Sequence, residues 1–351
     1  MIDSLLSEVE AFRDKLARIR ISKKPGDFEW YPHDTLAVFR QLDRLLKGEN
    51  RKLLAPRRGT VLDLCCGDGD VSFFLESLGY EVDAVDHPVY NHNGMRGVRT
   101  LKEALGSQIR LFEVDIDRQF TLPREHYDLV IFLGVLYHVR NPFYVLEEIA
   151  RHTRRCVLST RVSSRFPNGK AMPKGIAAAY LLEEYELNND ETNYFIFSEQ
   201  GLRVLLQRTY FDIADYLLSG NEEDQRVFCL LDSRYGNVGD IELGEGWHAP
   251  EGSGWRWTEQ SFTLRAKAAP RQRTLKLELF LPDGLPPVTL SMTADGRHLP
   301  PATYETPGSQ TLTRPIDASE TSLAFHLSSC RPPDATDARE RGVIVKSVTI
   351  Q

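Results

Sequence analysis

Two different periods of apolar residues divide the chain into a helix-and-strand region and a strand-only region. From about residue 60 to residue 232, short apolar runs alternate with segments whose apolar residues recur every three or four positions. Such runs predict buried strands, and such recurrences predict amphipathic helices. Beyond residue 259 the helical period disappears, and apolar and polar residues alternate in short segments. The pattern predicts an α/β region followed by an all-β region.

The α/β region is predicted to form a Rossmann-like, mostly parallel sheet. Runs such as YDLVIFL at 127–133, apolar on both faces, are typical of central parallel strands. The pair at 211–218 and 226–232, joined by the polar turn SGNEEDQ, predicts an antiparallel edge. The other strands are expected near 61–64, 81–86, 108–114 and 156–161, and the helices at 71–78, 141–152 and 199–208.

Two segments flank or interrupt this alternation. A helical amino-terminal extension, residues 1–58, carries amphipathic helices at 3–20 and 34–47. Between them, residues 23–34 form either a linker packed on the core or a lid over a binding site. The insertion at 162–195, too long for a simple connection, suggests a binding role.

The carboxy-terminal segments predict a β-sandwich. Six short alternating stretches, split by Pro, Gly and Asp, lie within residues 259–351, and a Gly- and Trp-rich linker is expected at 236–258. The α/β domain then spans 59–235. The final pattern DARERGVIVKSVTI is loosely similar to modules attached to bacterial glycosyltransferases and glycan-modifying enzymes.

Composition narrows the class of protein. With 41% hydrophobic and 26% charged residues, the chain has the composition of a soluble globular protein, and no run is long enough to span a membrane. Five cysteines without metal spacing indicate a reducing, cytoplasmic compartment and no metal site. The net charge of −7, with no basic stripe, makes a nucleic-acid partner an unfavoured interpretation.

The stretch TVLDLCCGDGD, residues 60–70, carries the strongest chemical signal. Gly67 and Gly69 allow a sharp turn between a strand and a helix. Asp86 follows at the end of the next strand, where nucleotide-binding α/β units hold ribose hydroxyls. The acids of the turn suit a cation better than a pyrophosphate. They favour S-adenosylmethionine (SAM), which carries a sulfonium, over NAD or ATP.

Three motifs resemble the class I SAM-dependent methyltransferases. They are VLDLCCGDGD, FLGVLYHVRNPFYVLEEI and NNDETNYFIFSEQGLRVLL. Within this class the chain is similar to a bacterial group that contains the tRNA wobble-uridine carboxymethyltransferases. In the turn, Cys65 stands where that group has its first glycine. By resemblance, the cofactor-binding residues are Asp63, Cys65, Gly67, Asp68, Gly69, Asp86, Asp115, Ile116, Leu133 and Gly134.

The same resemblance points to catalytic residues, and the loops expected above the carboxyl ends of the strands supply candidate acceptor residues. Tyr137 and His138 match an L-Y-H motif near the transferring group, and His138 is the candidate general base because imidazole titrates near neutral pH. A structural histidine is the alternative. Arg161 either holds an anionic acceptor or pairs with an acid. The candidate acceptor-binding residues are Tyr31, His33, Arg161, Tyr180, Asn193 and Tyr194. Those of the insertion, Tyr180, Asn193 and Tyr194, alternatively cap the sheet.

The sequence thus predicts a SAM-dependent methyltransferase acting on a sugar, a glycan intermediate or another small molecule. Two alternatives stay open. One is a tRNA wobble-uridine modifying transferase that uses a carboxylated SAM held by basic side chains, for which Lys23 and Lys24 lie in a suitable segment. The other is a non-catalytic scaffold joined to a carbohydrate-binding sandwich. The oligomeric state does not follow from the sequence.

Overall fold

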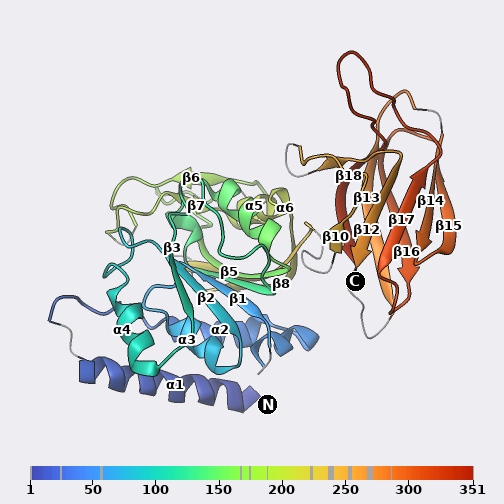
Figure 1. Ribbon diagram of the computed structural model, residues 1–351. Helices are drawn as coiled ribbons and strands as arrows, with labels where there is room; N and C mark the ends of the chain where they lie inside the picture. The colour runs from blue at the N-terminus through green and yellow to red at the C-terminus, as the bar shows by residue number, and fades with distance from the viewer. Residues whose placement is uncertain are drawn as a thin grey trace. The chain divides into compact units, whose positions relative to one another are not determined.

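The chain consists of two compact units, Met1–Ser233 and Arg234–Gln351 (Figure 1). The computed structural model describes residues 2–23, 26–55, 58–166, 168–173, 175–187, 189–221, 224–235, 241–251, 255–266, 272–285 and 287–350. Lys24 and part of the expected linker, 236–240 and 252–254, lie outside the described residues.

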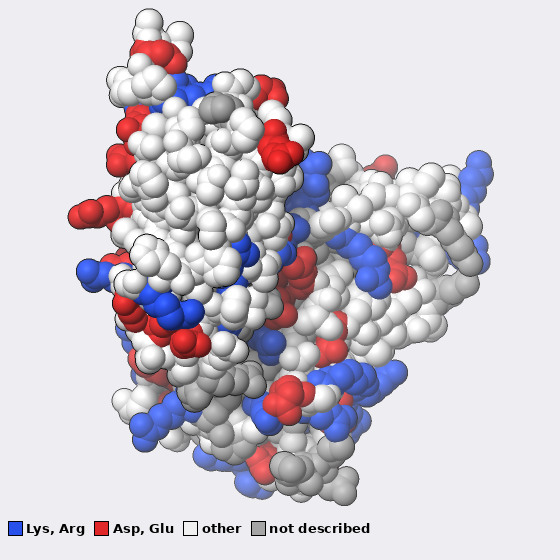
Figure 2. Space-filling view, turned by 90° about the vertical axis from the view of Figure 1, so that its right-hand side faces the viewer, with Lys and Arg blue, Asp and Glu red and all other residues white. Residues whose placement is uncertain are grey.

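Charges of both signs are mixed on the surface. On the face shown in Figure 2, Lys and Arg side chains lie among Asp and Glu, and a broad area carries neither. Within the described ranges, no helix has the length and apolar character that crossing a membrane requires.

A nine-stranded sheet forms the centre of the first unit. The apolar runs predicted its strands except β6 and β7. Five parallel strands lie in the order β3-β2-β1-β4-β5, β9 pairs antiparallel with β5 and β8, and β7 continues from the end of β5 to the edge strand β6. The strands are β1 Thr60–Leu64, β2 Glu81–Asp86, β3 Arg110–Glu113, β4 Leu129–Leu133, β5 Arg155–Val162, β6 Ala179–Leu181, β7 Phe195–Phe197, β8 Phe211–Ser219 and β9 Gln225–Ser233.

Helices cover both faces of this sheet, with α1 to α4 on one side and α5 and α6 on the other (Figure 1). Asn141 caps α5, since its side chain accepts a hydrogen bond from the Tyr144 N–H and Pro142 follows at the first helical position. The helices are α1 Ile2–Lys23, α2 Val38–Leu45, α3 Asp70–Ser77, α4 Arg96–Leu105, α5 Pro142–His152 and α6 Glu199–Arg208, and the short 3-10 helices are η1 Thr35–Ala37, η2 Gly48–Leu54 and η3 Leu136–His138.

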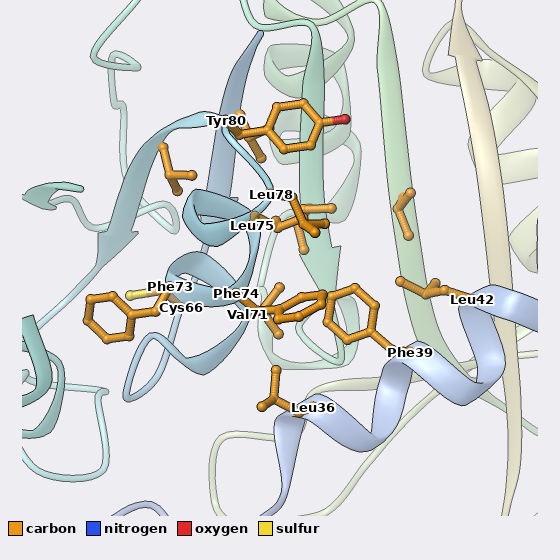
Figure 3. Packing of buried hydrophobic residues seen from close by; sticks show 14 of the residues in the cluster. Leu36, Phe39, Leu42, Cys66, Val71, Phe73, Phe74, Leu75, Leu78 and Tyr80 are labelled. Carbon is orange, nitrogen blue, oxygen red and sulfur yellow. The ribbon is translucent and has the colours of Figure 1, made fainter. Parts of the chain in front are cut away.

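The core between the sheet and the amino-terminal helices fixes the position of the glycine turn. Phe39 of α2 meets Phe74 of α3 edge to face, with ring centroids 4.7 Å apart (Figure 3). Phe12 of α1 packs on the same Phe74 ring at 5.6 Å. Aromatic pairs of this geometry add to the stabilisation from burial alone. Helices α1 and α2 therefore hold α3, and with it the turn that precedes α3.

The second unit is a β-sandwich. A five-stranded sheet of order β10-β12-β17-β14-β15 and a four-stranded sheet of order β11-β18-β13-β16 enclose one apolar core. In β13, buried residues alternate strictly with exposed or partly buried ones, which explains why the period of two was visible in the sequence. The strands are β10 Ile241–Leu243, β11 Arg256–Trp257, β12 Ser261–Ala266, β13 Arg273–Leu281, β14 Val288–Ala294, β15 Arg297–Tyr304, β16 Gly308–Ile316, β17 Ser322–Leu327 and β18 Ile344–Ile350.

Part of the stretch expected to be a linker belongs to this sandwich. Strand β10 pairs with β12, and β11 pairs with β18. The Trp247 ring packs on the buried Phe262 ring, and its indole N–H donates to the Thr263 carbonyl over 2.7 Å. The tryptophan thus serves the sandwich core, and the sandwich begins before residue 259.

Candidate functional site

A cavity of about 460 Å³ opens at the carboxyl ends of the central strands. Open α/β sheets bind ligands in this crevice. Residues that follow β1, β2, β3 and β4 form most of the wall, and the 26–35 segment and the 190–194 loop complete it. The described lining residues are Tyr31, Thr35, Cys65, Cys66, Gly67, Asp86, His87, Tyr90, Asn91, His92, Val114, Asp115, Ile116, Asp117, Leu133, Gly134, Val135, His138, Val139, Asp190, Thr192 and Tyr194.

The turn after β1 presents its backbone to this cavity. Cys65 and Gly67 adopt φ values of +62° and +60°, in the left-handed region. A Cβ added to Gly67 would meet no atom within 4 Å, so this glycine leaves open space where a ligand can approach. The pKa of the Cys65 thiol is raised well above its usual range by burial and by the neighbouring Asp86 carboxylate, so the group stays a neutral thiol.

Asp86 is the buried acid at the centre of the wall. Its Oδ2 accepts hydrogen bonds from the Gly67 N–H at 2.8 Å and from Asn91 Nδ2 at 2.9 Å, and its Oδ1 accepts one from the His87 N–H at 2.8 Å. A carboxylate offers about four acceptor positions, which leaves Oδ1 able to accept from a ribose hydroxyl. Burial is the largest influence on this group and raises its pKa against the effect of these donors.

The segments after β3 and β4, the strands that flank β2 and β1 in the sheet, also line the cavity. The Asp115 carboxylate faces Arg118 Nε at 3.0 Å, and the apolar Ile116 side chain lies beside it in the lining. Gly134 has a φ of +72° and donates its N–H to the Ser159 carbonyl, which leads the chain sharply away from β4. An acidic side chain, an apolar side chain and exposed backbone thus occur together in this part of the lining.

Two acids of the turn have structural partners instead of facing the cavity. Asp63 is buried and accepts a hydrogen bond from Ser72 Oγ at 2.5 Å, which ties β1 to α3. Asp70, at the start of α3, pairs with Arg20 of α1 at 2.6 Å. Neither is a lining residue of the cavity. Their sequence position next to the glycines could not reveal these contacts, because both partners come from other elements.

Asp68 and Gly69 also serve the packing around the turn. Asp68 accepts from the Tyr31 N–H at 2.9 Å and from Asn93 Nδ2 at 2.7 Å. A Cβ on Gly69 would lie 2.6 Å from the Val98 side chain of α4. The glycine is therefore required for close packing of the turn on α4. Both residues act behind the cavity wall.

His138, in η3, faces the cavity and is held from behind. Its Nδ1 lies 2.8 Å from Thr192 Oγ1 and 3.2 Å from the Thr192 carbonyl oxygen. Burial lowers its pKa below the usual range, so the ring is mostly neutral at pH 7. Thr192 Oγ1 in turn donates to Asp190 Oδ1 over 2.6 Å.

The aromatic residues near His138 divide into lining and supporting residues. Tyr137 is buried behind the wall, and its carbonyl accepts the Tyr194 N–H at 2.8 Å. Tyr194 lines the cavity, with the Arg140 guanidinium 4.9 Å from its ring centroid. Tyr31 also lines the cavity, and burial, the largest cause, raises its phenol pKa.

Four predicted acceptor residues lie away from the lining. Arg161 bonds Asp224 Oδ1 at 2.6 Å, which is the ion-pair alternative that its sequence left open. Asn193 donates to the Leu187 and Asp190 carbonyls and shapes its own loop. Tyr180 belongs to the edge strand β6 and is partly buried. The exposed His33 contacts the Tyr31 ring at a centroid distance of 5.3 Å.

Several lining residues escaped sequence reasoning. His87, Tyr90, Asn91 and His92 directly follow the strand that ends in Asp86, and Asn91 anchors both Asp86 and the Gly67 carbonyl. Their position after a parallel strand was the available signal. Thr35, the first residue of η1, gave no such signal.

Comparisons with known proteins bear on this site. Residues 36–215, just over half of the chain, match a family model described as a methyltransferase domain. No curated protein matches the chain.

Among solved structures, PH0226 protein from Pyrococcus horikoshii OT3 is 20% identical, with a TM-score of 0.40 over 56% of this chain and 91% of that one. The N-terminal domain of EvdMO1, in the presence of SAH and D-fucose, is 18% identical, with a TM-score of 0.45 over 63% and 97%. The 1,6-didemethyltoxoflavin-N1-methyltransferase of Burkholderia thailandensis is 18% identical, with a TM-score of 0.38 over 50% and 72%. Likenesses of this size transfer no acceptor to this chain.

The match of the family model spans β1 to β4, the strands whose carboxyl ends carry most of the cavity wall, and it includes the glycine turn, Asp86 and His138. The chain therefore belongs to the methyltransferase domain family and is a SAM-dependent methyltransferase.

Proposed function

We propose that the protein transfers the methyl group of SAM to a hydroxyl group of an uncharged, hydroxyl-rich small molecule such as a sugar or a glycan intermediate. The observation that carries this proposal is that one cavity is lined both by an adenosine-type group of residues around Asp86 and by a neutral histidine, His138. When bound, SAM supplies an electrophilic methyl carbon, whose bond to sulfur breaks with the electron pair remaining on sulfur.

The positions of the lining residues support a role for each of them. Asp86 would accept from the ribose, Asp115 and Ile116 would hold the adenine, and the backbone at Gly67 and Gly134 would leave room for the methionine portion. His138 would take the proton of the acceptor hydroxyl as the new C–O bond forms. Tyr31 and Tyr194 would flank the acceptor, because both line the cavity.

The charges of the lining favour an acceptor without phosphate. Four carboxylates, Asp86, Asp115, Asp117 and Asp190, are among the described lining residues, and Lys and Arg are not. The same feature disfavours the tRNA-modifying alternative, whose carboxylated cofactor needs a basic partner. Lys23, at the end of α1, is exposed and is not a lining residue. The mixed charges in Figure 2 likewise offer no basic stripe on that face for nucleic acid.

Cofactor binding can be tested by calorimetry on the purified protein. SAM and S-adenosylhomocysteine (SAH) should bind far more tightly than NAD or ATP. Asp86→Ala should weaken SAM binding by about 1–3 kcal/mol, because the donors around the carboxylate lose a buried acceptor. Glu113→Ala is the matched control, since Glu113 is exposed at the end of the neighbouring strand β3 and pairs with Arg99. Failure of both sulfur nucleosides to bind would refute the proposal.

The acceptor can be sought by following SAH release in the presence of sugars and glycosides. With an active acceptor, His138→Gln and Tyr194→Ala should lower turnover while SAM affinity stays within about tenfold, because both residues touch the acceptor side. Turnover that survives both changes, or SAM affinity that collapses with them, would place the acceptor elsewhere.

A further inference from the structure

The loop at 189–194 reaches His138 with two side chains that sequence analysis did not single out. Thr192 Oγ1 donates its proton to Asp190 Oδ1 over 2.6 Å, and the Thr192 N–H donates to the same oxygen over 2.9 Å. The Thr192 hydroxyl and the Asp190 carboxylate both lie near His138 Nδ1. Thr192 Oγ1 is 2.8 Å from this nitrogen, and Asp190 Oδ2 is 3.9 Å from it. All three residues line the cavity.

These contacts determine where the imidazole carries its proton. The hydroxyl proton of Thr192 is committed to Asp190, so its oxygen can only accept from the ring. The Thr192 carbonyl, 3.2 Å from Nδ1, can also only accept. Nδ1 must therefore carry the hydrogen, and in the neutral ring Nε2 is the basic nitrogen. No described residue forms a hydrogen bond with Nε2.

We propose that Asp190 and Thr192 are positioning residues that fix His138 in the Nδ1–H tautomer and so keep Nε2 ready to accept the proton of the acceptor hydroxyl. The role of Nε2 as proton acceptor rests on the proposed function, whereas the tautomer of His138 rests only on the contacts of its ring. In the reaction, the hydroxyl proton moves to Nε2 while the C–O bond forms, and the Nδ1 proton stays in place. The Asp190 carboxylate then faces the resulting imidazolium.

Other charged groups near the ring act in both directions. Burial has the largest effect and lowers the pKa of His138, Asp190 raises it, and Arg226 lowers it. Tyr137 lies against the ring at a centroid distance of 4.3 Å, and Tyr31 faces both Tyr137 and Asp190. The Asp190 carboxylate thus offsets part of the free-energy cost of charging the buried His138 ring. A general base becomes charged in this way once in each turnover.

The tautomer can be measured directly by nitrogen-15 NMR of histidine-labelled full-length protein, without any acceptor. Of the nine histidines, the signals of His138 are those lost in His138→Gln. The wild type should show a neutral ring protonated at Nδ1, with a pKa below that of free histidine. A ring protonated mainly at Nε2 would overturn the proposal.

Variants separate hydrogen bonding from charge. Asp190→Ala frees the Thr192 hydroxyl to donate to Nδ1, so the ring should shift toward the Nε2–H tautomer. Asp190→Asn keeps an oxygen that can accept from Thr192, so the tautomer should be retained while the pKa falls further, because the negative charge is gone. The proposed positioning by Asp190 and Thr192 would be contradicted if Asp190→Ala kept the Nδ1–H tautomer. It would also be contradicted if Asp190→Asn lost that tautomer.

Glu191→Gln is the matched control, since this neighbouring carboxylate faces Tyr185 at 2.9 Å and should leave the His138 signals unchanged. SAH affinity, measured on each variant, reports whether the site remains folded. It also separates the two proposals. If the wild type fails to bind SAH, only the methyltransfer proposal is refuted. If the protein binds SAH but its His138 ring is protonated at Nε2, only the proposed positioning by Asp190 and Thr192 is refuted.

Discussion

Two carboxylates near the ends of neighbouring strands, Asp63 in β1 and Asp86 in β2, have different roles in this protein. Asp86 lines the cavity and keeps a free acceptor position on Oδ1, whereas Asp63 is buried inside the fold and accepts a hydrogen bond from Ser72. Sequence reasoning could place both at the ends of buried strands, because apolar runs mark those strands. It could not separate their roles, because the partners of these acids, Asn91 for Asp86 and Ser72 for Asp63, come close only in the folded structure.

Asp63 should make stability depend on pH. Burial raises its pKa from 3.8 to about 7. The folded protein therefore binds this proton more tightly than the unfolded chain, so the stabilisation is fully present below about pH 4 and is lost as the pH rises through about 7. Asp63→Asn, which keeps an acceptor for Ser72, removes this contribution. In thermal denaturation, the stability of the variant relative to the wild type should increase between pH 4 and pH 8. A difference in stability that does not change with pH would contradict the raised pKa of Asp63.

At the scale of elements, the periodic apolar residues were sufficient to predict the position of a strand or helix when one or both of its faces are buried. Strands β1, β2, β4 and β5 and helix α5 lie within about two residues of their expected positions. Strand β15 was missed because Pro300 and Pro301 interrupt the alternation, which an edge strand tolerates. The pocket loop after β2 has no period, so only its position indicated a role.

The amino-terminal helix is tied to the glycine turn by Arg20. This side chain pairs with Asp70 at 2.6 Å and lies over the Trp30 ring at 5.5 Å. Because the Asp70 side chain is only 6% exposed, Arg20→Met would leave a buried carboxylate without its partner. We expect a loss of about 3 kcal/mol in the free energy of unfolding.

The control for this change is Arg40→Met. Arg40 pairs with Glu10 at 3.1 Å, but both side chains are more than half exposed, and exposed pairs contribute about 0–1 kcal/mol. Chemical denaturation of the two variants should therefore differ clearly. Equal losses would mean that α1 is not anchored through Asp70.

At the scale of the whole molecule, every described lining residue of the cavity belongs to the first unit. That unit also has its own core, formed by the sheet and its helices. We therefore propose that a protein truncated after Arg234 folds and binds SAM with an affinity within about threefold of the full chain. Insolubility or loss of binding would show that the sandwich is needed for the fold of the first unit.

The acidic lining of the cavity has a consequence for turnover. Asp86 and Asp190 form no ion pair with a described Lys or Arg side chain, so they favour a cationic ligand. The donor carries a sulfonium charge that its product SAH lacks, and methyl transfer thus removes part of the attraction that brought the cofactor in. Dissolved salt weakens such attraction. Raising the ionic strength should therefore reduce SAM affinity more than SAH affinity in calorimetry. A ratio of the two affinities that is indifferent to salt would mean that these carboxylates do not discriminate donor from product.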